Sequence, residues 1–139
     1  MIPKFRVWHY ELGRLMSVNV CFFQDSEIEE FELNDTLMND YITAYTDEIE
    51  LMQSTGLRDK NGKEIFEGDI VRTTRFLGRA DEIGGFYEYE KDYVGVVKVL
   101  EGSWVIDTGS VAVRLWSEID ESEVLGNIYE NLEFLEVNE

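Results

Sequence analysis

The only histidine and the only cysteine of the chain, His9 and Cys21, fall in neighbouring stretches of strand-like sequence. A thiol beside an imidazole can act as an activated nucleophile. However, Cys21 stands among aromatic residues, where a free cysteine is usually a small buried apolar side chain. His9 stands at the end of a predicted strand. We therefore interpret both as structural residues and expect no enzyme activity.

Carboxylates offer a second kind of chemistry, because the chain carries 30 acidic residues. With so many acids some are neighbours by chance, and most belong to solvated faces. A small hydrolase that uses two carboxylates stays as a third hypothesis. It requires a clustered, buried pair of acids in the structure.

The stretch "DKNG" at residues 59–62 does not match a calcium-binding loop. An EF-hand has glycine at its sixth position and glutamate at its twelfth, whereas counting from Asp59 places Gly62 fourth and Ile70 twelfth. The glycines of residues 78–85 lack the spacing of a phosphate-binding loop. One histidine and one cysteine do not make a zinc site. We expect no metal and no cofactor.

Three arginines, Arg72, Arg75 and Arg79, precede the aromatic stretch "FYEY" and form the best candidate for nucleic-acid binding. The acids around them are Asp81, Glu82, Glu88 and Glu90. Because binding to phosphates needs a net positive surface, we favour ion pairing of the arginines with these acids. A nucleic-acid-associated module stays as the alternative function.

The net charge of −18 is extreme for 139 residues and unevenly distributed. Residues 1–50 carry 3 basic and 11 acidic groups, residues 51–100 carry 8 and 9, and residues 101–139 carry 1 and 10. Such a surface repels phosphate backbones and attracts basic partner surfaces. We expect a protein partner, and nucleic acid is disfavoured.

No stretch of the sequence predicts a membrane or export signal. The N-terminal "MIPKFRVWHYELGRL" lacks the apolar core of a signal peptide. No apolar run approaches the roughly 18–20 residues of a membrane span. A single cysteine excludes an internal disulfide framework and fits a reducing compartment. We expect a soluble, intracellular protein.

Short runs of β-branched and aromatic residues between glycine turns predict a mostly β chain. The expected strands are 5–8, 15–23, 27–33, 48–53, 69–76, 93–100, 103–107, 111–116 and 123–128. Residues 34–46 are ambiguous, and we favour a short helix or turn at 35–40 that leads into a strand. Residues 77–91 are expected to form a long loop or irregular hairpin.

These elements predict an N-terminal antiparallel β region over residues 1–55 and a small SH3-like β-barrel over residues 56–139, with at most one or two short helical turns. The two parts are also compatible with one compact unit. A tight Asn61-Gly62 hairpin joins them, and its residue pair is typical of a two-residue type I′ turn. Exposed strands in so short a chain favour a homo-oligomer.

Three stretches of the sequence resemble the YopX family of bacteriophage and prophage proteins. They are "FRVW" at 5–8, "LMQSTGLRDKNGKEIFEGDIV" at 51–71 and "GNI" at 126–128. The agreeing residues are Phe5, Arg6, Trp8, Gln53, Thr55, Gly56, Leu57, Asp59, Lys60, Asn61, Gly62, Gly68, Asp69, Ile70, Val71, Gly126, Asn127 and Ile128. His9, Ser54 and Phe66 depart from the residues common at their positions.

The resemblance implies a mostly β protein of phages of Gram-positive bacteria that works in the host cytoplasm and has no established biochemical activity. We therefore hypothesise a non-enzymatic interaction module that binds a host or phage protein. The candidate partner surface consists of Gln53, Thr55, Arg58, Asp59, Lys60, Asn61, Arg72, Arg75 and Arg79.

Overall fold

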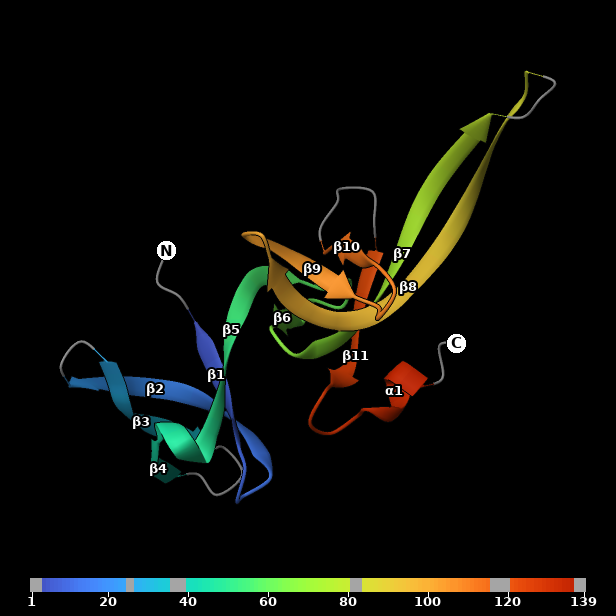
Figure 1. Cartoon of the computed structure of the whole chain (residues 1–139). Coiled ribbons are helices and arrows are strands. Elements are labelled where there is room, and N and C mark those ends of the chain that lie inside the picture. Colours follow the sequence, from blue (N-terminus) through green and yellow to red (C-terminus); the bar gives the residue numbers. More distant parts are fainter. Residues whose placement is uncertain (1–3, 25–26, 36–39, 81–83, 116–120, 137–139) are drawn as a thin grey trace. The chain divides into compact units, whose positions relative to one another are not determined.

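The computed structural model describes residues 4–24, 27–35, 40–80, 84–115 and 121–136 (Figure 1). The chain divides into two compact units, which comprise residues 1–54 and 55–139. The sequence places this boundary after residue 55.

The first unit is built on an antiparallel sheet with the strand order β4-β3-β2-β1-β5. The strands are β1 (Phe5–His9), β2 (Arg14–Gln24), β3 (Glu27–Asp35), β4 (Asp40–Tyr45) and β5 (Ile49–Arg58). A β-hairpin formed by β1 and β2 confirms the first predicted pair, and Gly13 accommodates its turn with a φ of 63°. Since β5 extends past residue 54, it continues into the second unit.

The predicted short helix or turn at residues 35–40 falls mostly on residues 36–39, which lie outside the described residues. The residues on either side of them, Asp35 and Asp40, are paired with each other as the ends of β3 and β4. The strand expected after them is confirmed as β4. A single 3₁₀ turn, η1 (Thr46–Glu48), then leads into β5.

Alternation along the strands builds the core of the first unit. In β4, Ile42 and Ala44 point inward, and in β3, Phe31 and Leu33 do the same. They pack with the remaining members of the cluster, which are Val7, Met16, Val18, Ile49 and Leu51. One face of this sheet is therefore apolar, and the other is left to polar and aromatic side chains.

The second unit contains an antiparallel sheet with the order β10-β9-β8-β7-β11. Its strands are β7 (Asp69–Ala80), β8 (Phe86–Leu100), β9 (Ser103–Asp107), β10 (Ala112–Arg114) and β11 (Glu121–Asn127). The short strand β6 (Glu64–Phe66) lies next to β5. The mostly β class is confirmed, and the barrel-like arrangement is not closed.

Of the two forms expected for residues 77–91, the long loop is wrong and a hairpin is present, with regular pairing. β7 runs to Ala80 and β8 starts at Phe86, and the two strands pair in continuous register from Ile70–Val96 to Ala80–Phe86. Among the described residues, β11 pairs with β7 as far as Thr74 and β9 pairs with β8 from Val96 onward. Residues 75–80 and 86–91 therefore extend as a two-stranded ribbon beyond the rest of the sheet (Figure 1).

Apolar side chains from the sheet and from β6 form the core of the second unit. Ile65, Val71, Val97, Ile106 and Leu115 are all nearly inaccessible to solvent. Leu57, Trp104 and Val124 pack against this cluster from its border. At about 1.5–3 kcal/mol for each fully buried large apolar side chain, this burial is the main favourable contribution to folding of the unit.

The turns of the second unit differ from the prediction in one respect. Among the described residues, Glu101 is the only non-glycine with a positive φ, at 50°, and Gly102 follows it with 80°. The type I′ turn therefore lies at Glu101-Gly102, between β8 and β9. The Asn61-Gly62 hairpin exists, but only Gly62 has a positive φ, of 81°. Its loop is a type I turn followed by a glycine bulge, with Gly62 N donating to Asp59 O at 2.9 Å.

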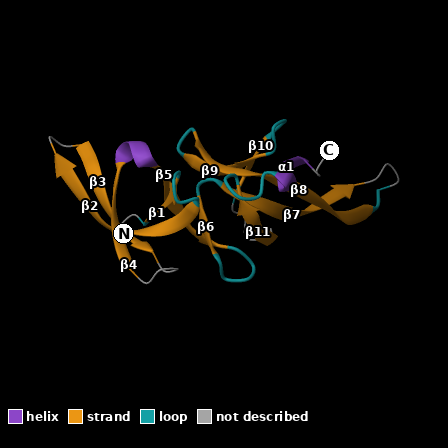
Figure 2. Ribbon diagram, turned by 90° about the horizontal axis from the view of Figure 1, so that it is seen from below, coloured by secondary structure: helices purple, strands orange, loops and turns teal. Residues whose placement is uncertain are grey.

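Helix makes a small contribution to this chain (Figure 2). In the described ranges it is confined to η1 and to α1 (Glu133–Glu136), as the sequence predicts. Neither helix in these ranges has the length and apolar character needed to cross a membrane.

The Glu101→Asn variant is expected to be more stable than the wild type by about 1 kcal/mol, because asparagine tolerates the left-handed backbone of this turn better than glutamate. Urea unfolding at neutral pH measures the change. Glu101→Gln is the matched control, since it removes the same charge without gaining that tolerance. An equal gain in both variants would show that the effect comes from charge and contradict the conformational explanation.

Candidate partner surface

The carboxylate of Asp59 organises the loop between β5 and β6. Its Oδ1 accepts hydrogen bonds from the backbone N–H of Asn61 at 2.9 Å and of Lys63 at 2.8 Å. Its Oδ2 accepts a third bond, at 2.9 Å, from the N–H of Val124 in β11. Aspartate suits the first position of a turn because its short side chain reaches the amide groups that the turn exposes.

These contacts also attach the β5–β6 hairpin to an open edge of the sheet. β11 is the terminal strand, and Lys60 N donates to Ser122 O at 2.8 Å beside the bond from Val124. Terminal strands expose unpaired backbone groups that invite association with other strands. The hairpin satisfies two of these groups and protects the edge at this point.

The pKa of the Asp59 carboxyl lies below its usual value, although the side chain is buried. Burial alone raises the pKa. The backbone hydrogen bonds from Val124, Lys63 and Asn61, together with the charge of Lys63, stabilise the ionised form and outweigh burial. Asp59 is thus an ionised structural group whose oxygens are occupied by the protein's own amides.

Lys60 and Arg72 meet on one carboxylate of β11. Glu123 Oε1 lies 2.8 Å from Arg72 Nη2, and Glu123 Oε2 lies 3.2 Å from Lys60 Nζ. The two cationic side chains are 41% and 45% exposed, so each ion pair contributes only about 0.2–1 kcal/mol to stability. The ion pairing expected for the arginines thus occurs at Arg72, with Glu123 as the partner.

The three arginines do not form one basic strip. Side chains alternate between the faces of a strand, so Arg72 and Arg75, three positions apart in an unbroken pairing with β8, lie on opposite faces. Arg75 Nη2 donates to Arg114 O at 3.4 Å, and its guanidinium lies 5.9 Å from the ring centre of Tyr93. Arg79 lies in β7 opposite Tyr87, and its side chain is outside the described residues.

Among the other residues of the predicted surface, Thr55 and Arg58 form side-chain hydrogen bonds with backbone groups. Thr55 Oγ1 donates to Ile65 O at 2.7 Å and accepts from Leu57 N. Arg58 is exposed and donates to Gly62 O at 2.8 Å, across the hairpin loop. Asn61 is exposed at the tip of the same loop, and Gln53 is exposed in the first unit.

The predicted surface is therefore only partly assembled in the structure. Four of its residues lie together around the hairpin: Arg58, Lys60, Asn61 and Arg72. Arg75 is separated from Arg72, and Thr55 and Asp59 have structural roles.

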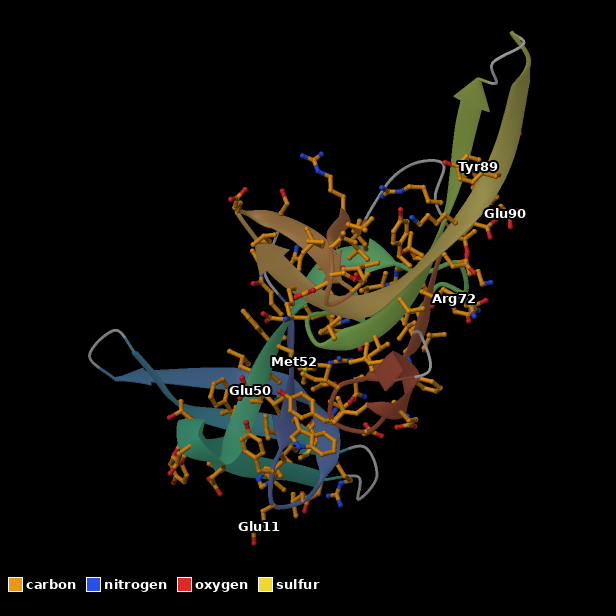
Figure 3. All side chains as sticks on the ribbon, turned by 45° about the vertical axis from the view of Figure 1, so that its right-hand side comes forward. Glu11, Glu50, Met52, Arg72, Tyr89 and Glu90 are labelled. Carbon is orange, nitrogen blue, oxygen red and sulfur yellow. The ribbon has the colours of Figure 1, made fainter. Side chains whose placement is uncertain are left out.

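Figure 3 shows the side chains that project from the ribbon formed by β7 and β8, where Tyr89 and Glu90 are labelled near its outer part. Within this ribbon, Lys91 Nζ lies 5.2 Å from the ring centre of Tyr93, on which Arg75 also lies. Two cations, Arg75 and Lys91, therefore lie against one aromatic ring, that of Tyr93. The acids Glu88 and Glu90 are exposed on the same strand, so the ribbon carries both signs of charge.

His9 is buried at 5% exposure, and its Nδ1 accepts a hydrogen bond from Leu12 N at 3.1 Å. The imidazole holds the turn between β1 and β2 through this bond. The side chain of Cys21 lies outside the described residues. Over the ranges that the structure describes, no group of three or more His, Cys, Asp or Glu side chains could hold a metal ion.

Two exposed tyrosines are not among the binding residues that the sequence predicts. Tyr41 and Tyr45 lie on β4 with 59% and 52% of their surface accessible. The alternation of "YITAY" at 41–45 was the available signal, because period-two alternation in a strand places both rings on the outer face. Apolar residues of the same segment also recur at helical spacing, so the sequence alone did not distinguish a helix from a strand.

Antiparallel strands in two small units, with polar side chains bonded to backbone amides, define a small acidic all-β protein. The model of the YopX family, described as YopX protein, matches residues 4–136. The chain belongs to the YopX family.

Two solved structures are similar over almost the whole chain. The crystal structure of protein EF1440 from Enterococcus faecalis is 24% identical, covers 97% of this chain and 99% of its own, and has a TM-score of 0.61. The crystal structure of protein yopX from Bacillus subtilis is 19% identical, covers 94% of this chain and 95% of its own, and has a TM-score of 0.52. No curated protein matches the chain. The two structures support the fold.

The Asp59→Ala variant is expected to lower the free energy of unfolding by about 2–4 kcal/mol, because three backbone N–H groups lose a charged acceptor. Urea unfolding at pH 7 measures the loss. Asp107→Ala is the control, since Asp107 is more exposed and accepts one turn N–H, from Gly109, together with the Lys98 ammonium. A loss for Asp59→Ala no larger than that of the control would contradict the role assigned to Asp59.

Stability should depend on pH through Asp59. A carboxyl whose pKa is depressed on folding stabilises the protein above its unfolded pKa, and this contribution is lost as pH falls through the folded pKa. The stability difference between the wild type and Asp59→Asn is therefore expected to be constant from pH 7 to about pH 5 and to shrink below about pH 4. Urea unfolding at stepped pH provides the measurement. A difference that grew as pH fell would refute the assignment.

Proposed function

We propose that this YopX-family chain is a phage-encoded, non-enzymatic interaction module that binds a host or phage protein in the host cytoplasm. The observation that carries the proposal is the distribution of charge. The chain has a net charge of −18, while two of the eight cations of residues 51–100, Lys60 and Arg72, are paired with a carboxylate of the same unit. The surface left for a partner is strongly acidic and complements a basic protein.

The hydrogen bonds of three polar side chains to backbone groups support a binding role over catalysis. Asp59, Thr55 and His9 each use their side-chain polar atoms on nearby backbone groups. A catalytic group needs a free, oriented atom near the reacting centre. For these three residues the polar atoms instead stabilise turns and strand pairs.

Nucleic-acid binding is the second candidate, carried by Arg75 and Lys91 beside Tyr93 on the β7–β8 ribbon. Aromatic rings interleaved with cations suit single-stranded nucleic acid. Two observations favour the protein partner instead. Arg72 is bound to Glu123, and Arg72 and Arg75 lie on opposite faces, so these two arginines do not form one continuous basic path for phosphates.

A homo-oligomer is part of the proposal. The two-stranded ribbon of residues 75–80 and 86–91 has exposed apolar and aromatic side chains, Phe76 at 37% and Tyr89 at 39%. This part of the chain is nearly neutral, so copies can approach here with little like-charge repulsion. Light scattering is expected to give a mass above the 16.2 kDa of one chain, and a monomer at high concentration would contradict self-association.

The main test is capture of a partner from a lysate of a Gram-positive host. The full chain, immobilised at low ionic strength, is expected to retain a basic protein that elutes at about 0.5 M salt, because salt screens exposed charges. An unrelated acidic protein of similar net charge, immobilised at the same density, is the control. Retention of the same proteins on both surfaces, or of none on the chain, would overturn the proposal.

The nucleic-acid alternative is tested separately by fluorescence anisotropy with a single-stranded oligonucleotide at low salt. The proposed function predicts no binding up to tens of micromolar protein. If binding occurs and is lost in the Arg75→Ala/Lys91→Ala variant, the alternative replaces the proposal.

A further inference from the structure

The outer face of β3 and β4 in the first unit carries aromatic rings and carboxylates in register. Ile42 and Ala44 of β4 point into the core, so Tyr41, Thr43 and Tyr45 point outward, and all three are exposed. Both rings have more than half of their surface accessible, at 59% and 52%. Large aromatic groups so accessible on a paired strand are available for contact with another molecule.

Carboxylates of the neighbouring strand lie directly opposite two of these residues, Tyr45 and Thr43, and an amide lies opposite Tyr41. Glu30 pairs with Tyr45, Glu32 pairs with Thr43, and Asn34 pairs with Tyr41. Asn19 of β2 donates to Glu32 Oε1 at 3.1 Å, which holds that carboxylate on the face. We call the set Tyr41, Thr43, Tyr45, Glu30 and Glu32 the tyrosine–carboxylate face.

The charged side chains of β3 and β4, the strands that carry this face, are all of one sign. Residues 15–57 contain ten acidic side chains and no lysine or arginine. In the second unit, by contrast, Lys60, Arg72 and Lys98 lie within ion-pair distance of carboxylates of the same unit. The segment that carries the tyrosine–carboxylate face supplies no cation of its own, so it complements a positively charged partner.

The backbone edge of β4 is less available than its side chains. β4 is the terminal strand of the sheet, but the N–H of Tyr41 donates to Asp40 Oδ1 at 2.8 Å and the N–H of Tyr45 donates to Glu48 Oε1 at 2.9 Å. Amide groups satisfied in this way do not pair with an incoming strand. A second copy of the chain would also bring the same negative charge. Both points favour an occupant that is basic and that binds through side chains.

We propose that the tyrosine–carboxylate face binds an arginine-rich segment of a partner protein. This inference rests on the proposed function and names the surface and the chemistry that would perform it. A guanidinium stacks on a tyrosine ring and forms paired hydrogen bonds with a carboxylate, and the cross-strand register places both kinds of group side by side. Arginine fits this combination better than lysine, because its planar group can do both at once.

The direct test is fluorescence anisotropy of a short labelled peptide of alternating arginine and serine, at about 50 mM salt. The Tyr41→Leu/Tyr45→Leu variant keeps the net charge of −18 and removes both rings. Its affinity is expected to fall about tenfold, as for the loss of two exposed cation–π contacts. The Tyr10→Leu/Phe134→Leu variant, which removes two exposed rings outside this face and keeps the net charge, is the matched control and is expected to bind like the wild type.

A second pair of variants separates local from total charge. Glu30→Gln/Glu32→Gln and Glu101→Gln/Glu133→Gln each remove two negative charges, but only the first pair lies on the face. The first is expected to weaken the peptide at least threefold more than the second. Equal losses, or equal affinity for an otherwise identical lysine peptide, would overturn the assignment, since they are the result of unspecific attraction to an acidic protein.

The proposal can be checked without relying on any variant. Titration of the isotope-labelled wild type with the arginine peptide, followed by amide NMR, is expected to shift the resonances of residues 30–32 and 41–45 most. Shifts centred elsewhere would refute it even if the tyrosine variant failed to fold. Lysate capture distinguishes failure of the tyrosine–carboxylate face from failure of the proposed function. A partner retained equally by Tyr41→Leu/Tyr45→Leu would remove the face and leave the proposed function intact, whereas no partner for the wild type would remove the proposed function itself.

Discussion

The carboxylate of Asp59 is the interaction on which the second unit depends most. One side chain closes the β5–β6 loop through two amides and reaches across to the N–H of Val124 in β11. The pairing of β11 with β7 shifts register between Val124 and Gly126, so the N–H bound by Asp59 lies beside an irregular step of the strand. Val124 also packs against the apolar cluster. Because one charged group is shared among the loop, the terminal strand and the border of the core, these three parts hold one another in place.

Other polar residues of the second unit act in the same way. Asp69 Oδ2 accepts from Phe66 N at 2.8 Å, where the chain turns through Gly68 with a φ of 86°. Asn127 Oδ1 accepts from the N–H groups of Tyr129 and Glu130 as β11 ends. Each of these side chains is buried and satisfies amides that a turn would otherwise leave unpaired. Turns fixed in this manner allow a small unit with an open sheet to keep a defined fold.

The sequence predicted the all-β class and most strands, because period-two alternation and glycine turns are local signals. It failed where a local signal pointed the wrong way. Gly84 and Gly85 do lie between the two strands, but Gly78 also suggested a loop, and β7 continues through it to Ala80 because cross-strand pairing outweighs the weak strand propensity of one glycine. The Asn61-Gly62 pair suggested a type I′ turn, and the nearby Asp59 side chain selected another turn by binding the loop amides. Neither outcome can be read from neighbouring residues alone.

The candidate surface was harder to predict for the same reason. Arg72 and Arg75 look like members of one strip in the sequence, but strand alternation separates them, and the partner of Arg72 is a glutamate 51 residues away. The residues that carry the family resemblance are also those most engaged with the backbone, as Thr55, Asp59, Asp69 and Asn127 show. Side chains that are already bound to the protein's own amides have little capacity left for a ligand. The proposed recognition of a partner therefore requires exposed side chains outside the resembling stretches, and the acidic first unit, with Tyr41 and Tyr45 on its outer face, has them.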